Sequence, residues 1–303
     1  MAIPTFKGII TVVATPFDQK GVINFDVLGR HIDFLISHGV HAILPGGSTG
    51  EYYSQTIEER KEILKFVAKH VAGRVPLYAG TNSARPDDTI ELGKLAVDLG
   101  YGAQMLAAPY YSLPNTDELA AHFRRIAATI PLPIILYNFP ARTGVDMSPS
   151  FLDKVADVKS ICAIKESSGS FARMLEHVVN FSGLQRICGA DDQAVDSFLW
   201  GANSWIAGAS NFMPAEHVAL YEACVLRKDF AEGLRLMKAM LKMFYLLEQG
   251  GKYIQYVKYG VELAGFASGA PRAPLQGLSE AERQQFRSLY EEIKSARLVR
   301  AAA

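Results

Sequence analysis

The segment IILYNFPARTGVDMSPSFLDKVADVKSICAIK (residues 134–165) opens and closes with a short apolar run, an arrangement that recurs along the chain. Ile134–Asn138 and Ile161–Lys165 are rich in apolar and β-branched residues at successive positions, which is typical of strands covered on both faces. Six more runs of this kind are Gly8–Phe17, Ala42–Gly47, Val75–Thr81, Gly102–Tyr111, Arg186–Asp191 and Trp205–Ala209. The sequence therefore predicts eight buried strands.

Helix-period patterns occupy most of the gaps between these runs. Apolar residues recur at three- and four-residue spacing in Phe25–Ile36 and in Ile63–Val67. Alternating strands and helices indicate a parallel sheet covered by helices, and eight such units favour a closed (β/α)8 TIM barrel. An open doubly wound sheet is the alternative fold.

The strand signal ends at residue 212, so we expect a barrel domain over residues 1–212 and a C-terminal α-helical region over residues 213–303. Phe230–Gln249 and Tyr253–Leu263 carry helical patterns, and a capping box at Ser279 begins a last helix. The apolar faces of these helices need a partner surface, which is either the barrel or another subunit.

Charge and composition exclude several classes of function. The 303 residues include 31 basic and 31 acidic side chains with a pI near 7.1, which offers no electrostatic case for binding nucleic acid or membrane surfaces. Cys162, Cys188 and Cys224 have no CxxC spacing, and their odd number indicates a reducing compartment. The N-terminal segment resembles neither a signal peptide nor a membrane span, so we expect a cytoplasmic protein.

Two side chains at the ends of predicted strands are candidates for catalysis, because TIM-barrel active sites lie at the carboxyl ends of the strands. Lys165 ends one strand, where lysine is rarely buried without a reason. Its side chain either extends to the surface or attacks a carbonyl as the free amine. Tyr137 ends the preceding strand. Because neighbouring strands lie about 4.8 Å apart, the side chains of Tyr137 and Lys165 could reach one small ligand. The simpler interpretation of Tyr137 is an aromatic residue of the hydrophobic core.

The loop Gly46–Glu51, with the sequence GGSTGE, follows the second predicted strand. Glycines let its backbone approach a ligand, its N–H groups can bind a carboxylate, and the hydroxyl of Ser48 or Thr49 can pass a proton. The same pattern is equally typical of a structural turn. Arg142, after the fifth strand, offers a bidentate fork for a second carboxylate, unless it is an ordinary surface residue.

The sequence lacks the common motifs for nucleotide binding, metal binding and serine hydrolysis. GxxxxGK[ST], GxGxxG, HExxH and GxSxG are absent from the sequence. Asp191, Asp192 and Glu51 are the carboxylates that would make a divalent-metal set, but acidic residues at strand ends are common without a metal. We therefore expect no metal site.

Five segments are informative as a set: GGSTGE (46–51), PYY (109–111), YNFPARTG (137–144), IKESSG (164–169) and GADD (189–192). Together they resemble the dihydrodipicolinate synthase / N-acetylneuraminate lyase family of class I lyases, and most of all its dihydrodipicolinate synthase-like members. The resemblance covers nearly the whole chain, including the helical tail. It implies a (β/α)8 barrel with a C-terminal helical region, usually assembled as a homotetramer from two tight dimers.

The resemblance also assigns catalytic roles. Lys165 matches the lysine that forms a Schiff base with pyruvate or another 2-oxo acid, and Tyr137 matches the tyrosine that shuttles protons. Thr49 matches the hydroxyl that links it to a second tyrosine. Tyr111 matches that second tyrosine, which members of the family donate across the dimer interface. This imine chemistry implies no metal and no organic cofactor.

Substrate-binding positions give conflicting signals. The backbone amides of Ser48 and Thr49 match the family's carboxylate cradle, and Ile206 matches a backbone carbonyl that faces the site. Arg142 stands where the synthases bind the carboxylate of the aldehyde substrate and where sialic-acid lyases usually have an apolar residue. Ser48 before Thr49 is more lyase-like, because the synthases often have two threonines.

The resemblance makes 4-hydroxy-tetrahydrodipicolinate synthase, which joins pyruvate to aspartate semialdehyde, the nearest named activity. Catabolic alternatives within the family are a hydroxypyrroline-carboxylate deaminase, a 2-keto-3-deoxy sugar acid aldolase or dehydratase, and N-acetylneuraminate lyase. A non-catalytic binding protein on the same barrel is a hypothesis of another class, which the complete catalytic set argues against. The positions that match the lysine-inhibitor site of regulated synthases hold Tyr52, Tyr53, Ile57, Arg60 and Ala84, so we expect no lysine feedback.

Overall fold

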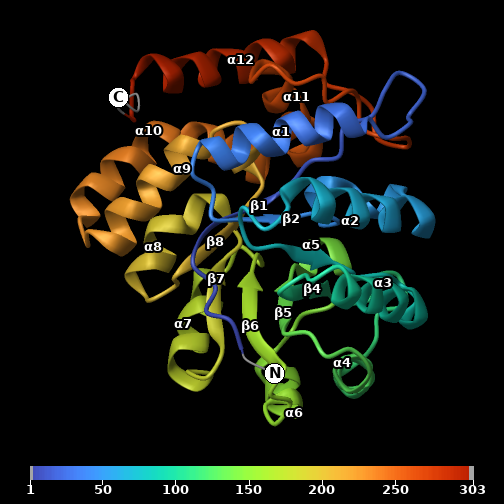
Figure 1. Ribbon diagram of the computed structural model, residues 1–303. Helices are drawn as coiled ribbons and strands as arrows, with labels where there is room; N and C mark the ends of the chain where they lie inside the picture. The colour runs from blue at the N-terminus through green and yellow to red at the C-terminus, as the bar shows by residue number, and fades with distance from the viewer. Residues whose placement is uncertain (1–2, 300–303) are drawn as a thin grey trace.

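The computed structural model describes residues 3–299 and contains eight parallel strands arranged as a barrel (Figure 1). They are β1 (Gly8–Val12), β2 (Ala42–Leu44), β3 (Tyr78–Gly80), β4 (Ala103–Ala107), β5 (Ile134–Asn138), β6 (Ile161–Glu166), β7 (Gln185–Cys188) and β8 (Ser204–Ala207). Their order is β2-β1-β8-β7-β6-β5-β4-β3. A parallel bridge between Ile43 and Leu77, and a 2.8 Å hydrogen bond from the N–H of Gly80 to the carbonyl of Pro45, join β2 to β3. The predicted TIM barrel and all eight strands are confirmed.

Helices between the strands cover the outside of the barrel. They are α1 (Phe25–Ser37), α2 (Ile57–Val71), α3 (Pro86–Asp98), α4 (Thr116–Thr129), α5 (Pro140–Thr143), α6 (Pro149–Val155), α7 (Phe171–Asn180) and α8 (Ala194–Leu199). Local sequence determines where several of them begin. Asn24 caps α1 through its side-chain oxygen, and a capping box of Thr56 and Glu59 begins α2.

The core has an inner and an outer part. Inside the barrel, alternate strand residues such as Ile10, Met105, Ile135 and Ile187 are fully buried against one another. Outside it, the other face of each strand packs against the apolar faces of the surrounding helices. The strands are covered on both faces, with only the first two residues of β7 partly exposed, so most of their sequences show apolar runs instead of alternating patterns.

The C-terminal helices are α9 (Pro214–Tyr221), α10 (Phe230–Gln249), α11 (Tyr253–Leu263) and α12 (Glu280–Ser295), with a π-helical turn over Glu222–Leu226. The predicted bounds of α10 and α11 are confirmed, as is the capping box that begins α12. The apolar face of α10 packs on α8 and α9, and α11 packs on α12. The end of α10 and the start of α11 thereby reach the carboxyl ends of the strands.

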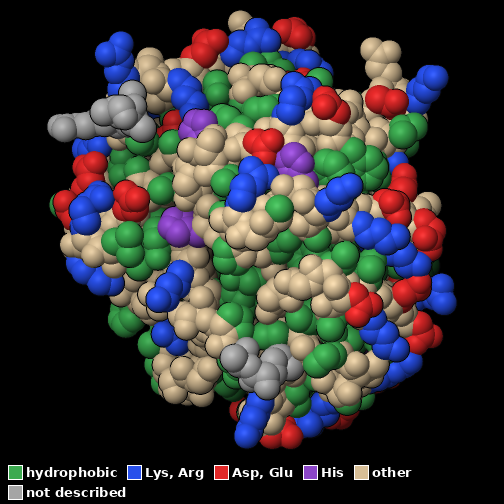
Figure 2. All heavy atoms as spheres, in the orientation of Figure 1, with side chains coloured by type: hydrophobic (Ala, Val, Ile, Leu, Met, Phe, Trp, Pro, Cys, Tyr) green, Lys and Arg blue, Asp and Glu red, His purple; other side chains and the backbone are tan. Residues whose placement is uncertain are grey.

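The molecular surface carries mixed charge. Basic and acidic side chains are interspersed over the face in Figure 2, in keeping with the equal numbers of each in the sequence. Across residues 3–299, no helix has the length and apolar character needed to cross a membrane.

Candidate active site

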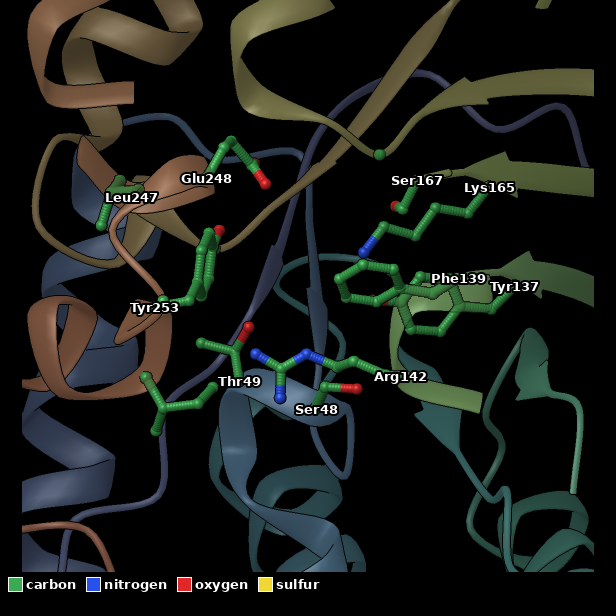
Figure 3. Close-up of a pocket in the computed structure, with 14 residues that line it drawn as sticks. Ser48, Thr49, Tyr137, Phe139, Arg142, Lys165, Ser167, Leu247, Glu248 and Tyr253 are labelled. Carbon is green, nitrogen blue, oxygen red and sulfur yellow. The ribbon is translucent and has the colours of Figure 1, made fainter. Parts of the chain in front are cut away.

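A cavity with an empty volume of about 620 Å³ opens at the carboxyl ends of the strands (Figure 3). Its walls come from the segments that end or follow β2, β5, β6, β7 and β8, and from the junction of α10 and α11. Five predicted site residues line it: Ser48, Thr49, Tyr137, Arg142 and Lys165. This is the position at which TIM barrels carry their active sites.

Lys165 and Tyr137 occupy directly paired positions of β6 and β5. The Nζ atom of Lys165 lies 4.1 Å from the centroid of the Tyr137 ring, and the two residues are only 6% and 5% exposed. Nζ makes no hydrogen bond or ion pair with any residue in the range 3–299, although its side chain is buried. The amine is therefore sheltered from bulk water yet open to a ligand in the cavity.

The next pair along the two strands points away from the cavity and fixes their relative position. Asn138 pairs with Glu166, and its side-chain amide donates to both carboxylate oxygens at 3.1 and 3.3 Å. The N–H of Ser168 donates to the same carboxylate at 2.7 Å. Burial raises the pKa of Glu166, whereas these hydrogen bonds act against that rise. Alternation along each strand thus turns Lys165 and Tyr137 inward together.

Gly189, at the end of β7, makes room for the lysine side chain. A Cβ atom at this position would lie 2.8 Å from Cγ of Lys165, 2.5 Å from the carbonyl oxygen of Glu166 and 2.1 Å from Oγ of Ser167. Any residue other than glycine would therefore push Lys165 or its strand out of place. The GADD segment contained this glycine, but its contact with the lysine depends on the barrel register.

Gly46 in the Gly46–Glu51 loop has a structural role, a reading that the sequence left open beside ligand binding. Gly46 has φ +75°, and a Cβ there would lie 2.5 Å from the carbonyl oxygen of Gly80. The glycine therefore lets β2 and β3 approach each other where the barrel closes. Ser48 and Thr49 then form a short 3₁₀ turn that lines the cavity.

Glu51 anchors this loop to the C-terminal region. Its carboxylate is fully buried and accepts from Nζ of Lys258 at 2.9 Å and from the backbone N–H of Arg272 at 3.0 Å. Lys258, on α11, also donates to the carbonyl of Thr15 at 2.9 Å. The C-terminal helices thus hold the segment that contains Ser48 and Thr49.

Arg142 lies on the short helix α5 and extends toward the cavity beneath Phe139 and Tyr137 (Figure 3). Its guanidinium carbon is 5.4 Å from the centroid of the Phe139 ring, a distance at which a cation is attracted to the ring face. Arg142 has no carboxylate partner within residues 3–299. Its fork is available to an acidic ligand.

Two predicted site residues do not line this cavity. Tyr111 is 94% exposed and has φ +69°, so its side chain projects from the tip of the loop after β4. Ile206 lies within β8 in the barrel interior and is 1% exposed, while Gly208 is the residue beyond this strand that lines the cavity. The hydroxyls of Thr49 and Tyr137 share the cavity without a hydrogen bond between them in the structure of this single chain.

Sequence reasoning missed an acidic group that comes from the C-terminal region. Glu248, near the end of α10, accepts a 3.0 Å hydrogen bond from the backbone N–H of Asp191 and lines the cavity. Asp191 is itself buried, and it accepts from the indole N–H of Trp205 at 3.0 Å and from the Tyr253 hydroxyl at 2.8 Å. Burial raises the pKa of Glu248, and the negative charge of Asp191 raises it further.

The carboxylates considered for a divalent metal are separated into different networks. The carboxylate of Asp191 accepts hydrogen bonds from Trp205 and Tyr253. The carboxylate of Glu51 accepts from Lys258 and from the N–H of Arg272. No group of three or more potential metal ligands occurs within the described part of the chain.

Comparison with known proteins agrees with this geometry. The model of the dihydrodipicolinate synthetase family matches residues 5–293. The chain belongs to this family. A 4-hydroxy-tetrahydrodipicolinate synthase from Exiguobacterium sibiricum is 38% identical over 277 residues, which cover 91% of this chain and 94% of that protein. Members of the family are class I lyases, and this chain is therefore an enzyme of that class.

Solved structures from the same family have the same fold. The 4-hydroxy-tetrahydrodipicolinate synthase of Methylacidiphilum fumariolicum superposes with a TM-score of 0.92 at 29% identity, covering 97% of this chain and 98% of that one. YagE, a prophage protein of this family from Escherichia coli K12 solved in complex with pyruvate, has a TM-score of 0.90 at 30% identity. That alignment covers 96% of this chain and 99% of YagE.

Proposed function

We propose that this chain forms a Schiff base between Lys165 and the keto carbon of pyruvate or another 2-oxo acid. The observation that carries the proposal is a buried amine, free of protein partners, 4.1 Å from the ring centroid of Tyr137 in a cavity at the carboxyl ends of the strands. We propose an activity like that of 4-hydroxy-tetrahydrodipicolinate synthase, with pyruvate and aspartate semialdehyde as substrates. The names of the relatives at 33–38% identity support this choice.

The proposed reaction begins when the amine of Lys165 adds to the keto carbon. Protonation of the resulting hydroxyl and loss of water give a protonated imine, which withdraws electrons from the neighbouring carbon. That carbon loses a proton, and the enamine so formed adds to the aldehyde carbon of the second substrate, whose oxygen takes up a proton. Water then adds to the imine, and the departing amine restores Lys165. Cleavage of an aldol is the same sequence in reverse.

Tyr137 is the proposed general acid and base for these proton transfers, because its side chain lies beside the amine. Thr49 is proposed to pass the proton onward to Tyr111 of a second subunit. The exposed and outward-projecting Tyr111 supports this role, since a side chain in that position is free to enter a neighbouring molecule. The proposal thus includes a tight dimer, assembled in pairs as a homotetramer in the cytoplasm.

Two sets of groups are proposed to bind the carboxylates of the two substrates. The backbone amides of Ser48 and Thr49 are proposed to hold the carboxylate of the 2-oxo acid, with the carbonyl of Ile206 facing the same site. Arg142 is proposed to bind the carboxylate of the aldehyde through a bidentate pair. The free guanidinium at the cavity edge supports this assignment, and it favours an acidic acceptor over a neutral sugar.

Feedback inhibition by lysine is not part of the proposal. Arg60 is 6% exposed, donates to the carbonyl of Gly80 at 3.1 Å and lies 5.1 Å from the centroid of the Tyr52 ring. Large side chains thus fill the position at which regulated relatives are expected to bind lysine.

Borohydride reduction in the presence of pyruvate tests the imine. We expect a covalent adduct on Lys165, located by mass spectrometry of peptides, and none on the Lys165→Ala variant, which should keep its fold. Lys238→Ala, at an exposed lysine on α10, is the matched control and should be labelled like the wild type. Absence of an adduct from the wild type would leave the non-catalytic binding protein as the better explanation.

A substrate panel tests the second part of the proposal. It should contain pyruvate with aspartate semialdehyde, pyruvate with N-acetylmannosamine, a hydroxypyrroline carboxylate and a 2-keto-3-deoxy sugar acid. We expect the highest kcat/KM for aspartate semialdehyde. A higher value for any other member would reassign the chain to a catabolic branch while keeping the imine.

A further inference from the structure

The C-terminal region contributes a polar group to a cavity that otherwise belongs to the barrel. Glu248 comes from the last turn of α10, and in Figure 3 its carboxyl points across the cavity toward the side on which Lys165 lies. Oε1 accepts from the N–H of Asp191 at 3.0 Å. Oε2 has no hydrogen-bond partner among residues 3–299. One oxygen therefore holds the side chain in place, and the other is open to a ligand.

Asp191 does not compete with Glu248 for such a ligand. One of its carboxylate oxygens accepts from the indole N–H of Trp205 and the other from the hydroxyl of Tyr253. With both oxygens engaged and a side chain that is 1% exposed, Asp191 is fixed beneath the cavity wall. Its role toward Glu248 is electrostatic and positional.

The protonation state of Glu248 indicates what it would bind. Burial and the nearby charges of Asp191 and Asp192 raise its pKa, and Lys165 across the cavity lowers it by a smaller amount. A carboxyl that keeps its proton both donates and accepts hydrogen bonds, as a hydroxyl group does. A ligand cation would instead require the ionised form.

A second unpaired polar group lies across the cavity from Glu248, beside Lys165 (Figure 3). Ser167 is 8% exposed, and its buried Oγ has no hydrogen-bond partner within residues 3–299 although the residue lines the cavity. Leu247 and Ile254 contribute apolar surface beside Glu248. A polar group in such surroundings discriminates strongly, because a substrate that cannot pair with it leaves it desolvated and unsatisfied.

We propose that Glu248 determines specificity for the distal part of the substrate by hydrogen bonding to a hydroxyl group beyond the keto carbon of a 2-oxo acid. The proposal rests on the proposed function, because it places the keto carbon at Lys165. Arg142 then binds an acidic end of the substrate, and Glu248 binds a hydroxyl that projects toward α10. A 2-oxo acid that carries both a distal hydroxyl group and a second carboxylate is the class of compound that uses both groups.

The test measures competition for Lys165. Labelled pyruvate and borohydride tag the lysine, and each competitor is characterised by the concentration that halves the labelling. The probes are 2-keto-3-deoxygluconate and 2-oxohexanoate, which has the same carbon chain without the distal hydroxyls. The variants are Glu248→Leu, Glu248→Gln and, as a control on the same helix, Gln249→Leu at an exposed position.

For Glu248→Leu we expect the half-suppressing concentration of 2-keto-3-deoxygluconate to rise about tenfold or more, as for loss of a buried hydrogen bond. The values for 2-oxohexanoate and unlabelled pyruvate should change less than about twofold. Glu248→Gln keeps an acceptor for the N–H of Asp191 and a donor for the ligand, so it should stay near the wild type. Gln249→Leu should match the wild type with all three compounds.

Three results would overturn the assignment. Equal losses with all competitors in Glu248→Leu would show a structural role, and no loss with any would show that the carboxyl does not contact the ligand. A loss in Glu248→Gln as large as in Glu248→Leu would show that a charged carboxylate is needed, as for an ammonium ligand. Failure of the proposed function is distinct from these, because the wild type would then not be labelled by pyruvate at all.

Discussion

Tyr137 and Lys165 face each other from paired positions of adjacent strands, with the lysine Nζ 4.1 Å from the centroid of the tyrosine ring. The ring and the hydroxyl of Tyr137 have separable effects, because the ring packs against the amine and only the hydroxyl can carry a proton. Their paired register follows from β5 and β6 being neighbours in the barrel.

Tyr137→Phe should therefore keep the fold and lower kcat by about 10²–10⁴-fold, the usual contribution of a general acid or base. Steady-state kinetics with the best substrate of the panel measures this, and thermal unfolding checks the fold. Tyr245→Phe, at a tyrosine that is 64% exposed on α10, is the control and should retain full activity. A Tyr137→Phe enzyme with undiminished kcat would remove the phenol from the proton path.

Arg142 offers a test of the acceptor's charge. Arg142→Ala should raise KM for aspartate semialdehyde by about tenfold or more, because a bidentate charge-assisted pair is lost. Pyruvate labelling of Lys165 should change little, since Arg142 is assigned to the second substrate. Arg85→Ala, at an exposed arginine, is the matched control. An equal effect on pyruvate labelling and on KM would place Arg142 at the first carboxylate instead.

Tyr111 can be tested by mixing inactive variants. If it acts in the site of a second subunit, Tyr111→Phe and Lys165→Ala should each be nearly inactive. A hybrid dimer would contain one site with both native residues, so mixing and re-assembly should restore up to about a quarter of wild-type activity in a random mixture. No recovery in a mixture shown by mass spectrometry to contain hybrids would confine Tyr111 to its own subunit.

Much of this architecture can be predicted from the sequence, because the local sequence patterns agree with the overall fold. Strands of a closed parallel barrel are buried on both faces, so Ile134–Asn138 and Ile161–Glu166 appear as apolar runs with their chemical groups at the ends. The capping boxes at Thr56 and Ser279 mark helix starts through side chains three residues apart. Such signals involve only near neighbours along the chain.

The parts that sequence could not provide depend on long-range contacts. Glu248 reaches the cavity because α10 packs on the barrel, and no pattern near it indicates a neighbour at Asp191. Gly46 looked like a ligand-binding glycine, but its neighbour is the backbone of Gly80 on the adjacent strand. The role proposed for Tyr111 depends on a contact with a second subunit, which no local pattern indicates.

The buried pair of Glu51 and Lys258 links the Gly46–Glu51 loop to α11, with side chains that are 0% and 2% exposed. Glu51→Gln would leave the lysine charge buried without its counter-ion, so we expect the free energy of unfolding to fall by about 3–5 kcal/mol. Urea denaturation measures this. Glu292→Gln, which breaks an exposed pair with Lys242, should cost less than about 1 kcal/mol. Similar decreases in the free energy of unfolding of the two variants would mean that the buried pair stabilises the fold no more than the exposed pair does.

Buried histidines should make the fold sensitive to acid, and His217 is the clearest case. Burial lowers the pKa of His217 to about 3, and its Nδ1 lies 2.7 Å from the carbonyl of Met213 while Nε2 has no hydrogen-bond partner in the described part of the chain. In the unfolded chain a histidine takes up its proton near pH 6.5. Between these values the unfolded state binds more protons, so stability rises with pH and is lost as the pH falls below about 6.5.

The loss approaches about 1.4 kcal/mol per pH unit for each such histidine once the pH is well below 6.5. His217→Gln removes one titrating group, so the free energy of unfolding should depend less steeply on pH between about 6 and 4 than in the wild type. Gln249→Leu, at an exposed position without a titrating side chain, should leave the slope unchanged. Other groups titrate alike in both proteins, so the difference in slope reports His217 alone. If the free energy of unfolding varied with pH equally in the wild type and in His217→Gln, the folded protein would accommodate a protonated His217 without loss of stability, which contradicts the prediction.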